Sequence, residues 1–243
     1  METNNNKQER LVEIKAGKTG YGILIESDGY VSRDLTENNK KIIKEALESR
    51  ENGEWYVPNP FVLDVVLQKY GIENANKRIY PEGILKREVE KYQKLIQQRM
   101  ALGELNHPEK SEIDLGRISH NIIECHWEGH TLVGKIEFNL TEGFRKYGIC
   151  SSLGDAAVNL IMNGYKIGVS SRGIGSVKSQ LGKTVVCDDF EIICWDVVAT
   201  PSTPGSYIGS REELEQYVES DTTRNDKPQL TEKINKIKEI LNS

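Results

Sequence analysis

The chain has 243 residues and a formal net charge of −5, with 28% charged and 37% hydrophobic side chains, an ordinary composition for a soluble globular protein. The acidic balance argues against a nucleic-acid-binding protein, which needs a basic face, and no apolar run approaches the roughly 18 residues that span a membrane. The polar N-terminus does not resemble a signal peptide, and the four cysteines form no Cys-x-x-Cys pair, so we expect free buried thiols in a reducing cytoplasm and no zinc ribbon.

The first part of the chain, residues 1–56, is predicted to be an N-terminal extension. It contains a strand-like run over 21–26 and a helix-like run over 35–49. Asp34 and Glu37 stand at the spacing of a capping box at the start of that helix.

The central part, residues 57–209, is denser in apolar residues and alternates strand-like and helix-like runs. In order, the pattern predicts a buried strand over 61–67, a loop over 74–78, a helix from Pro81 to about Met100, a hairpin of 117–127 with 131–139, a helix over 153–162, a strand over 165–169 and a strand over 190–198. A mixed α+β fold follows from this order.

The last part, residues 210–243, is predicted to be a C-terminal helical segment. Ser210 and Glu213 form a second capping box, and a polar linker precedes the terminal helix. One face of that helix carries an apolar stripe of Leu230, Ile234, Ile237 and Leu241. The stripe fits a helix docked on the core, and a partner-binding helix is the alternative.

Two short segments carry residues suited to catalysis. Gly-Glu-Leu-Asn-His-Pro (103–108) places His107 in a turn closed by proline, and Gly-Val-Ser-Ser-Arg-Gly-Ile-Gly-Ser (168–176) places Ser170 after an apolar run. A serine held at the end of a buried strand can act as a nucleophile if a histidine reaches it, and glycines after it let a substrate carbonyl approach backbone amides. These residues provide a candidate nucleophile and a candidate base for a serine hydrolase, and the sequence pattern alone does not show that the two meet.

Four blocks in this order resemble the prohead core proteases of tailed phages, the capsid-maturation serine peptidases, which are distantly similar to herpesvirus assemblin. The blocks are Asn-Lys-Arg-Ile-Tyr-Pro (76–81), the segments 103–108 and 168–176, and Trp-Asp-Val-Val-Ala-Thr-Pro-Ser-Thr-Pro (195–204). The resemblance covers about residues 60–208. It implies a largely antiparallel, barrel-like sheet surrounded by helices, as in the herpesvirus protease.

The resemblance also implies the residue roles. His107 would be the general base, Ser170 rather than Ser171 the nucleophile, and Asp196 the third member of the triad, where assemblin has a second histidine. The oxyanion candidates are Ser171, Arg172 and Gly173. For the Arg172 side chain, pairing with a local carboxylate is the favoured interpretation.

The implied function is limited cleavage of scaffold, core and capsid proteins inside the assembling phage prohead, in the host cytoplasm. No cofactor or metal, no nucleic acid and no membrane is expected to take part, and self-association into a homo-oligomer is expected. A catalytically silent structural or scaffold component of the head, with the same fold, is the alternative. A metal-dependent hydrolase that uses His107 with His120, His126 and His130 is disfavoured because the chain lacks a carboxylate–histidine motif. His126 and His130 have the i, i+4 spacing of a helical zinc pair, but Glu128-Gly129 breaks a helix there, so the three histidines over 120–130 are predicted to be solvated hairpin residues.

Family members resemble one another in cutting after glutamate with leucine or isoleucine two residues before it. Self-processing is therefore predicted at triplets near the chain ends, namely 11–13, 24–26, 230–232 and 237–239, which would leave fragments ending at Glu13, Glu26, Glu232 or Glu239. The triplet 102–104, beside the proposed base, shows that such sequences also arise by chance.

Overall fold

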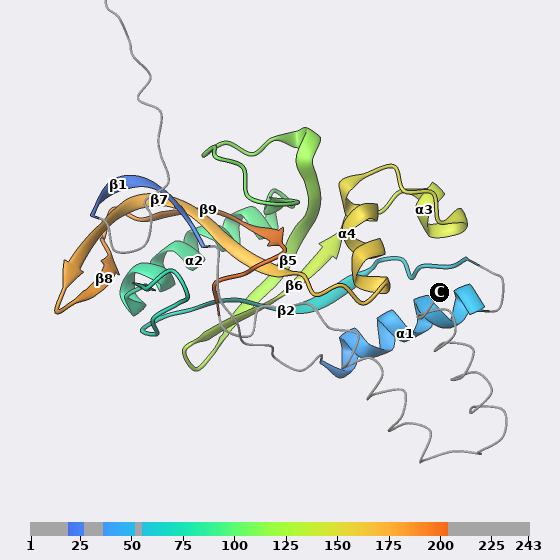
Figure 1. Ribbon diagram of the computed structural model, residues 1–243, viewed down its shortest axis with the longest axis horizontal. Coiled ribbons are helices and arrows are strands. Elements are labelled where there is room, and N and C mark those ends of the chain that lie inside the picture. The colour runs from blue at the N-terminus through green and yellow to red at the C-terminus, as the bar shows by residue number, and fades with distance from the viewer. Residues whose placement is uncertain (1–18, 27–35, 52–54, 204–243) are drawn as a thin grey trace, which may run out of the picture.

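The computed structural model describes residues 19–26, 36–51 and 55–203, which form two mostly antiparallel sheets with helices around them (Figure 1). The first sheet contains β1 (Gly20–Ile25), β7 (Gly168–Gln180), β8 (Lys183–Val186), β3 (Arg78–Ile79) and β9 (Glu191–Val198). The second contains β2 (Val62–Lys69), β6 (Thr131–Phe138), β5 (Ile118–Glu128) and β4 (Leu102–Glu104), in that order. The predicted α+β class is confirmed, but the described strands leave both sheets open, so no closed barrel is seen among them.

Strand β7 is the centre of the first sheet. Arg172 pairs with Ile25 of β1 on one edge and with Cys194 of β9 on the other. The strand begins at Gly168 rather than at residue 165 and continues to Gln180, so the prediction that the serines end a strand is wrong. Gly173 leaves room for the neighbouring aromatic ring, because a Cβ there would lie 2.4 Å from the Phe190 ring.

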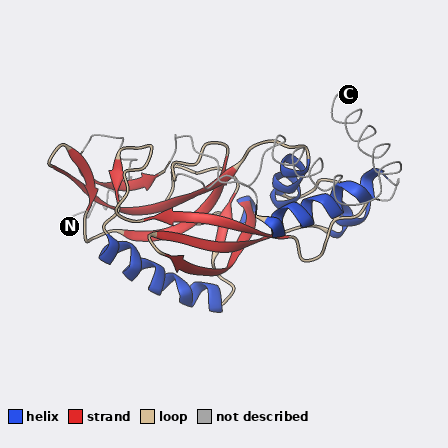
Figure 2. Ribbon diagram, turned by 90° about the horizontal axis from the view of Figure 1, so that it is seen from below, coloured by secondary structure: helices blue, strands red, loops and turns tan. Residues whose placement is uncertain are grey.

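The helices pack on the outside of the strands (Figure 2). They are α1 (Glu37–Glu51), α2 (Glu82–Gln97), α3 (Glu142–Tyr147) and α4 (Leu153–Met162). Helix α1 packs against β2, α2 against β5 and β9, and α4 against β5 and β6. One hydrophobic cluster fills the space between them and includes Trp195 of β9, so burial of apolar area holds the strand that carries Asp196.

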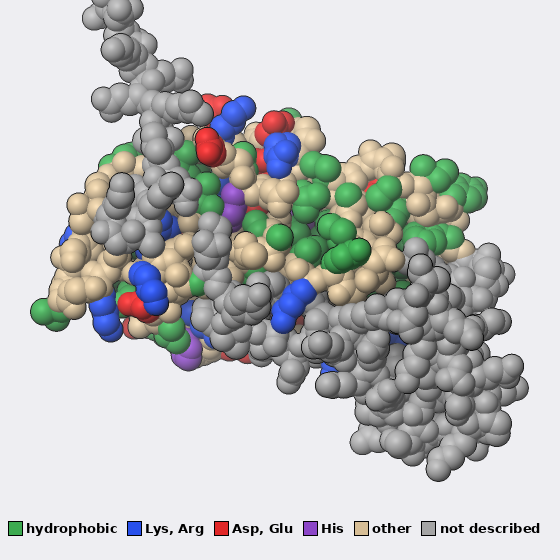
Figure 3. All heavy atoms as spheres, viewed as in Figure 1, with side chains coloured by type: hydrophobic (Ala, Val, Ile, Leu, Met, Phe, Trp, Pro, Cys, Tyr) green, Lys and Arg blue, Asp and Glu red, His purple; other side chains and the backbone are tan. Residues whose placement is uncertain are grey.

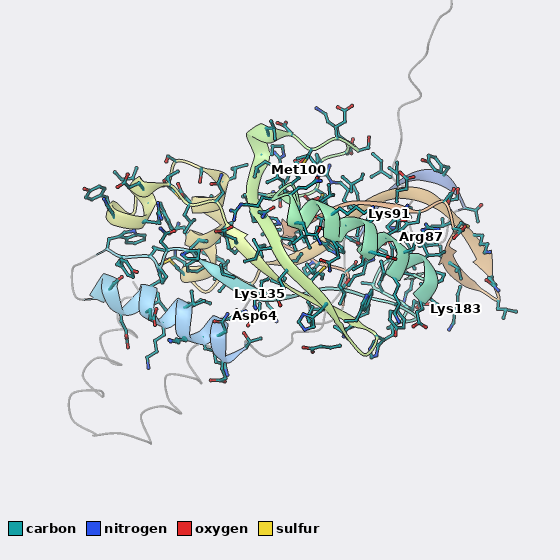
Figure 4. All side chains as sticks on the ribbon, turned by 180° about the vertical axis from the view of Figure 1, so that it is seen from behind. Asp64, Arg87, Lys91, Met100, Lys135 and Lys183 are labelled. Atoms are coloured by element: carbon teal, nitrogen blue, oxygen red, sulfur yellow. The ribbon has the colours of Figure 1, made fainter. Side chains whose placement is uncertain are left out.

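Helix α2 is tied to the segment that leads into β9. Pro81 stands just before its first residue, with φ −61 and ψ 142, and the chain turns helical at Glu82. Arg87, which Figure 4 labels together with Lys91 on this helix, donates to the Asp188 carboxylate at 2.7 Å and to the Phe190 carbonyl at 2.9 Å. These contacts fix where β9 begins.

Most of the predicted elements are present. The strand over 21–26, the helix from Pro81, the hairpin and the helix over 153–162 match β1, α2, β5–β6 and α4, while β3, β4, β8 and α3 were not predicted. The helix predicted over 35–49 is α1, and Thr36 caps it by accepting from the Asn39 amide at 3.2 Å. Asp34 lies outside the described residues.

The predicted division into parts stays a prediction. Strand β1 and helix α1 belong to the predicted extension, yet they pack on β7 and β2. The predicted C-terminal segment over 210–243, with its second capping box and apolar stripe, lies outside the described residues. Among the helices that are described, none combines the length and apolar character needed to cross a membrane.

The cysteines and the surface complete the description. Cys125 and Cys194 are free and buried, as predicted, whereas Cys150 is exposed and Cys187 half-buried. Hydrophobic side chains gather on the face that carries α3 and α4 (Figure 3), and the large exposed residues of that region include Tyr147 and Ile149.

Candidate active site

Pairing of β7 with β9 places the predicted serine and aspartate on one face of the first sheet. Ser170 is the register partner of Asp196, and Ser171 is the partner of Trp195. Directly paired residues point to the same side of a sheet and successive residues alternate, so Ser170 and Asp196 share a side while Ser171 faces the opposite one. Both Ser170 and Asp196 are fully buried.

His107 is delivered to Asp196 by the turn after β4. Asn106 has φ 64, a left-handed conformation that asparagine adopts more readily than most residues, and its amide donates to the Val197 carbonyl at 2.8 Å. This anchor brings Nδ1 of His107 to 2.7 Å from Oδ2 of Asp196. The two residues are 89 positions apart in the sequence.

Asp196 is held as an ionised carboxylate. Oδ1 accepts from the Glu104 amide at 2.9 Å and Oδ2 from Nε of Arg172 at 2.9 Å. Burial by itself raises the pKa of Asp196, but the His107 hydrogen bond, the His107 and Arg172 charges and the Glu104 amide outweigh it, so the pKa lies below its usual value. A charged Asp196 suits a residue that must orient and stabilise an imidazolium.

The Arg172 side chain is fully occupied by this network. Besides Asp196, it donates to Oε1 of Glu104 at 2.9 Å and to the Lys110 carbonyl at 2.6 Å. Arg117 contacts the other oxygen of Glu104 at 3.1 Å. The favoured interpretation of Arg172, pairing with local carboxylates, is therefore confirmed.

The second ring nitrogen of His107 is available. Nε2 is buried and has no hydrogen-bond partner among the residues that the structure describes. The Ser170 hydroxyl donates instead to the main-chain carbonyl of Glu26, the residue that follows β1. The structure thus brings His107 and Asp196 together and places Ser170 beside Asp196, with the serine hydroxyl directed at a peptide carbonyl.

The other oxyanion candidates lie within β7. Ser171 and Gly173 are inside the part of the strand that pairs with β9, and β1 runs along the opposite edge from Arg172 onward. These residues therefore lie within a strand, and not after its end as the sequence predicted.

Two positions near the site were not predicted as functional. Glu104 orients Asp196 through its amide and Arg172 through its carboxylate, and it stands in the same block as His107. Gly103 beside it has no room for a side chain, because a Cβ would lie 2.2 Å from Nε2 of His120. Both residues stand in the same sequence block as His107, residues 103–108, and this position was the signal that could have identified them.

The three remaining histidines do not share one environment. His126 and His130 are exposed hairpin residues, as predicted. His120 is fully buried, so its prediction as a solvated residue is wrong; Nε2 lies 2.9 Å from the Trp195 carbonyl and Nδ1 2.8 Å from the Ser119 hydroxyl. Within the described ranges, no three His, Cys, Asp or Glu residues are grouped to hold a metal ion.

Burial of His120 should make the fold sensitive to acid. Burial lowers the pKa of His120 to about 4, although the hydrogen bond to Trp195 and the charge of Asp196 act in the opposite direction. The unfolded chain binds a proton near pH 6.5 and the folded chain only near 4, so stability falls as the pH drops through this window, by up to about 3 kcal/mol. Urea unfolding of the wild type and His120→Gln from pH 7 to 4 should show a smaller loss for the variant. Equal losses would contradict the assignment.

Comparisons with known proteins identify the family to which this chain is similar. The sequence model of the family described as "Prohead core protein serine protease" matches residues 23–218. The chain is 30% identical over 184 residues to the prohead core protein protease of Enterobacteria phage T4, covering 74% of this chain and 83% of that protein. The solved structure of the bacteriophage T4 capsid assembly protease matches with a TM-score of 0.55 and 24% identity, over 74% of this chain and 98% of that one.

Proposed function

Because this chain belongs to the prohead core protein serine protease family, we propose that it is a serine endopeptidase in which Ser170 is the nucleophile, His107 the general base and Asp196 the residue that orients His107. Family membership makes the chain a protease of phage capsid maturation. The observation that supports the residue roles is the 2.7 Å contact of His107 Nδ1 with the buried Asp196, which leaves Nε2 without a partner among the described residues.

The roles follow from this arrangement. Asp196 accepts from Nδ1–H, which keeps Nε2 unprotonated and able to take the Ser170 proton as the hydroxyl oxygen attacks the scissile carbonyl carbon. The imidazolium then protonates the leaving amine, and water hydrolyses the acyl-enzyme by the same path in reverse. The backbone amides of Ser171, Arg172 and Gly173 remain the oxyanion candidates, each such donor contributing about 3 kcal/mol. The Arg172 guanidinium, held by two carboxylates, positions Asp196 in this scheme.

The proposed substrates are the scaffold, core and capsid proteins of the phage head, cut after glutamate inside the assembling prohead in the host cytoplasm. Self-processing at the chain's own triplets belongs to the same proposal. Of these triplets, 24–26 lies among the described residues and ends beside Ser170. The triplet 102–104 forms β4, and its Glu104 is fully buried. The triplets 11–13, 230–232 and 237–239 lie outside the described residues. We also propose a homo-oligomer and a herpesvirus-protease-like fold.

A serine-directed phosphonate probe tests the mechanism. We expect covalent labelling of the wild type at Ser170, located by peptide mass mapping, and none in Ser170→Ala. EDTA should not change the labelling, since no metal takes part in the proposed chemistry. A catalytically silent head component is the alternative, and the burial of Ser170 and its contact with a main-chain carbonyl are the features that it would explain. A wild type that stays unlabelled while native would support that alternative.

A further inference from the structure

Strand β1 lies along β7 as its antiparallel neighbour (Figure 1). Extended peptides bind many proteins by adding an antiparallel strand to a sheet edge. The ladder pairs Ile25 with Arg172, and the Glu26 amide continues it by donating to the Ser171 carbonyl at 3.3 Å. The next group along the chain, the Glu26 carbonyl, accepts from the Ser170 hydroxyl. A peptide carbonyl is therefore presented to the proposed nucleophile at the end of β1.

The carboxylate of Glu26 is fully buried in a pocket of donors. Oε1 accepts from the Tyr80 hydroxyl and from Nη1 of Arg78 at 3.2 Å. Oε2 accepts from three further side chains, Asn74 at 2.6 Å, Asn76 at 2.8 Å and Ser202 at 3.3 Å. Burying a carboxylate is costly unless it is paired and hydrogen-bonded, and this one meets both conditions.

The phenol and guanidinium of this pocket are themselves buried. Arg78 is 1% exposed and Tyr80 is 2% exposed. Burial, followed by the Glu26 charge, raises the pKa of Tyr80, so its hydroxyl stays protonated and donates. Arg78 also donates to the Ile25 carbonyl at 2.8 Å, so one side chain holds both the backbone and the acid of the segment.

A second pocket receives the residue two positions earlier. Leu24 is fully buried in an apolar cluster with Tyr80, Leu85 and Phe190, to which Val177 and Val186 also belong. Side chains in a strand alternate, so residues 24 and 26 point to one side and Ile25 to the other. Tyr80 contributes to both pockets, its ring to the apolar cluster and its hydroxyl to the carboxylate. Leu24 and Glu26 are thus bound by one continuous surface, to which Tyr80 contributes.

We propose that Arg78, Asn74, Asn76, Tyr80 and Ser202 form the pocket that recognises the glutamate before the cleaved bond, and that residues 24–26 occupy it in cis as a built-in substrate. This inference rests on the proposed function. The bond presented to Ser170 is the one after Glu26. Ser170 Oγ bonds to the Glu26 carbonyl carbon and its proton passes through His107 to the departing amine; water then releases the Glu26 carboxylate and restores the hydroxyl. Until β1 leaves, it competes with substrates in trans.

The test measures selectivity, which does not depend on how much enzyme is folded. The assay uses two peptides that carry either Leu-Ile-Glu or Leu-Ile-Gln immediately before the cleaved bond and are otherwise identical. Both peptides are tested with the wild type, Arg78→Met and Tyr80→Phe. We expect the wild type to favour the glutamate peptide by roughly 100-fold or more in kcat/KM, because glutamine would leave the buried Arg78 without a carboxylate partner. Arg78→Met should bring the ratio close to one, and Tyr80→Phe should lower it about tenfold.

Arg99→Met is the matched control, since Arg99 is exposed and pairs with Glu137 at 2.9 Å, away from Glu26. Its selectivity ratio should equal that of the wild type. Intact-mass spectra measure cleavage of the chain after its own residue 26. A fragment ending at Glu26 should form in the wild type, and the corresponding fragment should be absent in Glu26→Gln and in Ser170→Ala.

The outcomes separate the two proposals. A wild type that cuts the glutamate peptide with a ratio unchanged by Arg78→Met and Tyr80→Phe would overturn the pocket and leave the peptidase intact. A wild type and a Glu26→Gln variant that are both native, cut neither peptide and resist the phosphonate probe would overturn the proposed function. If Arg78→Met does not fold, an unchanged ratio in Tyr80→Phe together with cleavage of Glu26→Gln after residue 26 would still refute the pocket.

Discussion

Replacing Ser170 with alanine should abolish peptide cleavage, whereas Ser171→Ala should retain substantial activity. The pairing of Ser170 with Asp196 and of Ser171 with Trp195 places the two hydroxyls on opposite sides of β7. Loss of the nucleophile of a serine protease costs about 10⁶-fold in kcat. Cleavage of a glutamate-containing peptide, followed by mass spectrometry, measures both variants on the same scale.

Thermal unfolding of both variants provides the control, because Ser170 and Ser171 are equally buried and each substitution removes one hydroxyl. Similar unfolding temperatures would assign a loss of cleavage to chemistry. If Ser171→Ala were inactive and Ser170→Ala cleaved normally, the nucleophile would be wrong by one residue, and so would its side of the sheet.

The second large effect is expected at the base and its partner. His107→Ala should cost about as much as Ser170→Ala, because the members of a triad act as a unit. Asp196→Asn should slow cleavage by about 10³-fold or more without eliminating it, since an amide in this place favours the wrong tautomer of His107. Peptide cleavage under single-turnover conditions measures these losses.

Asp196→Asn also removes one of the two carboxylates that face Arg172, so its stability must be separated from its chemistry. Glu104→Gln is the matched control, because it removes the other carboxylate while the contact of His107 with Asp196 is made by different atoms. Both variants should lose stability, as expected when a buried charge loses a partner. A loss of cleavage in Glu104→Gln as large as in Asp196→Asn would indicate that the charge network, and not the orientation of His107, accounts for the effect.

Local residue preferences determine where many of the elements begin and end. Pro81 marks the start of α2, Glu128-Gly129 marks the hairpin, and Asn163-Gly164 ends α4, because these residue types favour turns and helix ends through their own backbone preferences. The elements that were missed, β3, β4, β8 and α3, are two to six residues long, too short for a periodic pattern to develop.

The sequence by itself also determined the family and its candidate residues, because ordered blocks of particular residues carry that information. The tertiary structure decided what those residues do to one another. His107 meets Asp196 across 89 positions, and the Ser170 hydroxyl meets the Glu26 carbonyl across 144. Such contacts depend on which strands pair and in what register, which no local preference specifies. For the same reason, the position of β1 on β7 and the burial of Glu26 against Arg78 became visible only in the folded chain.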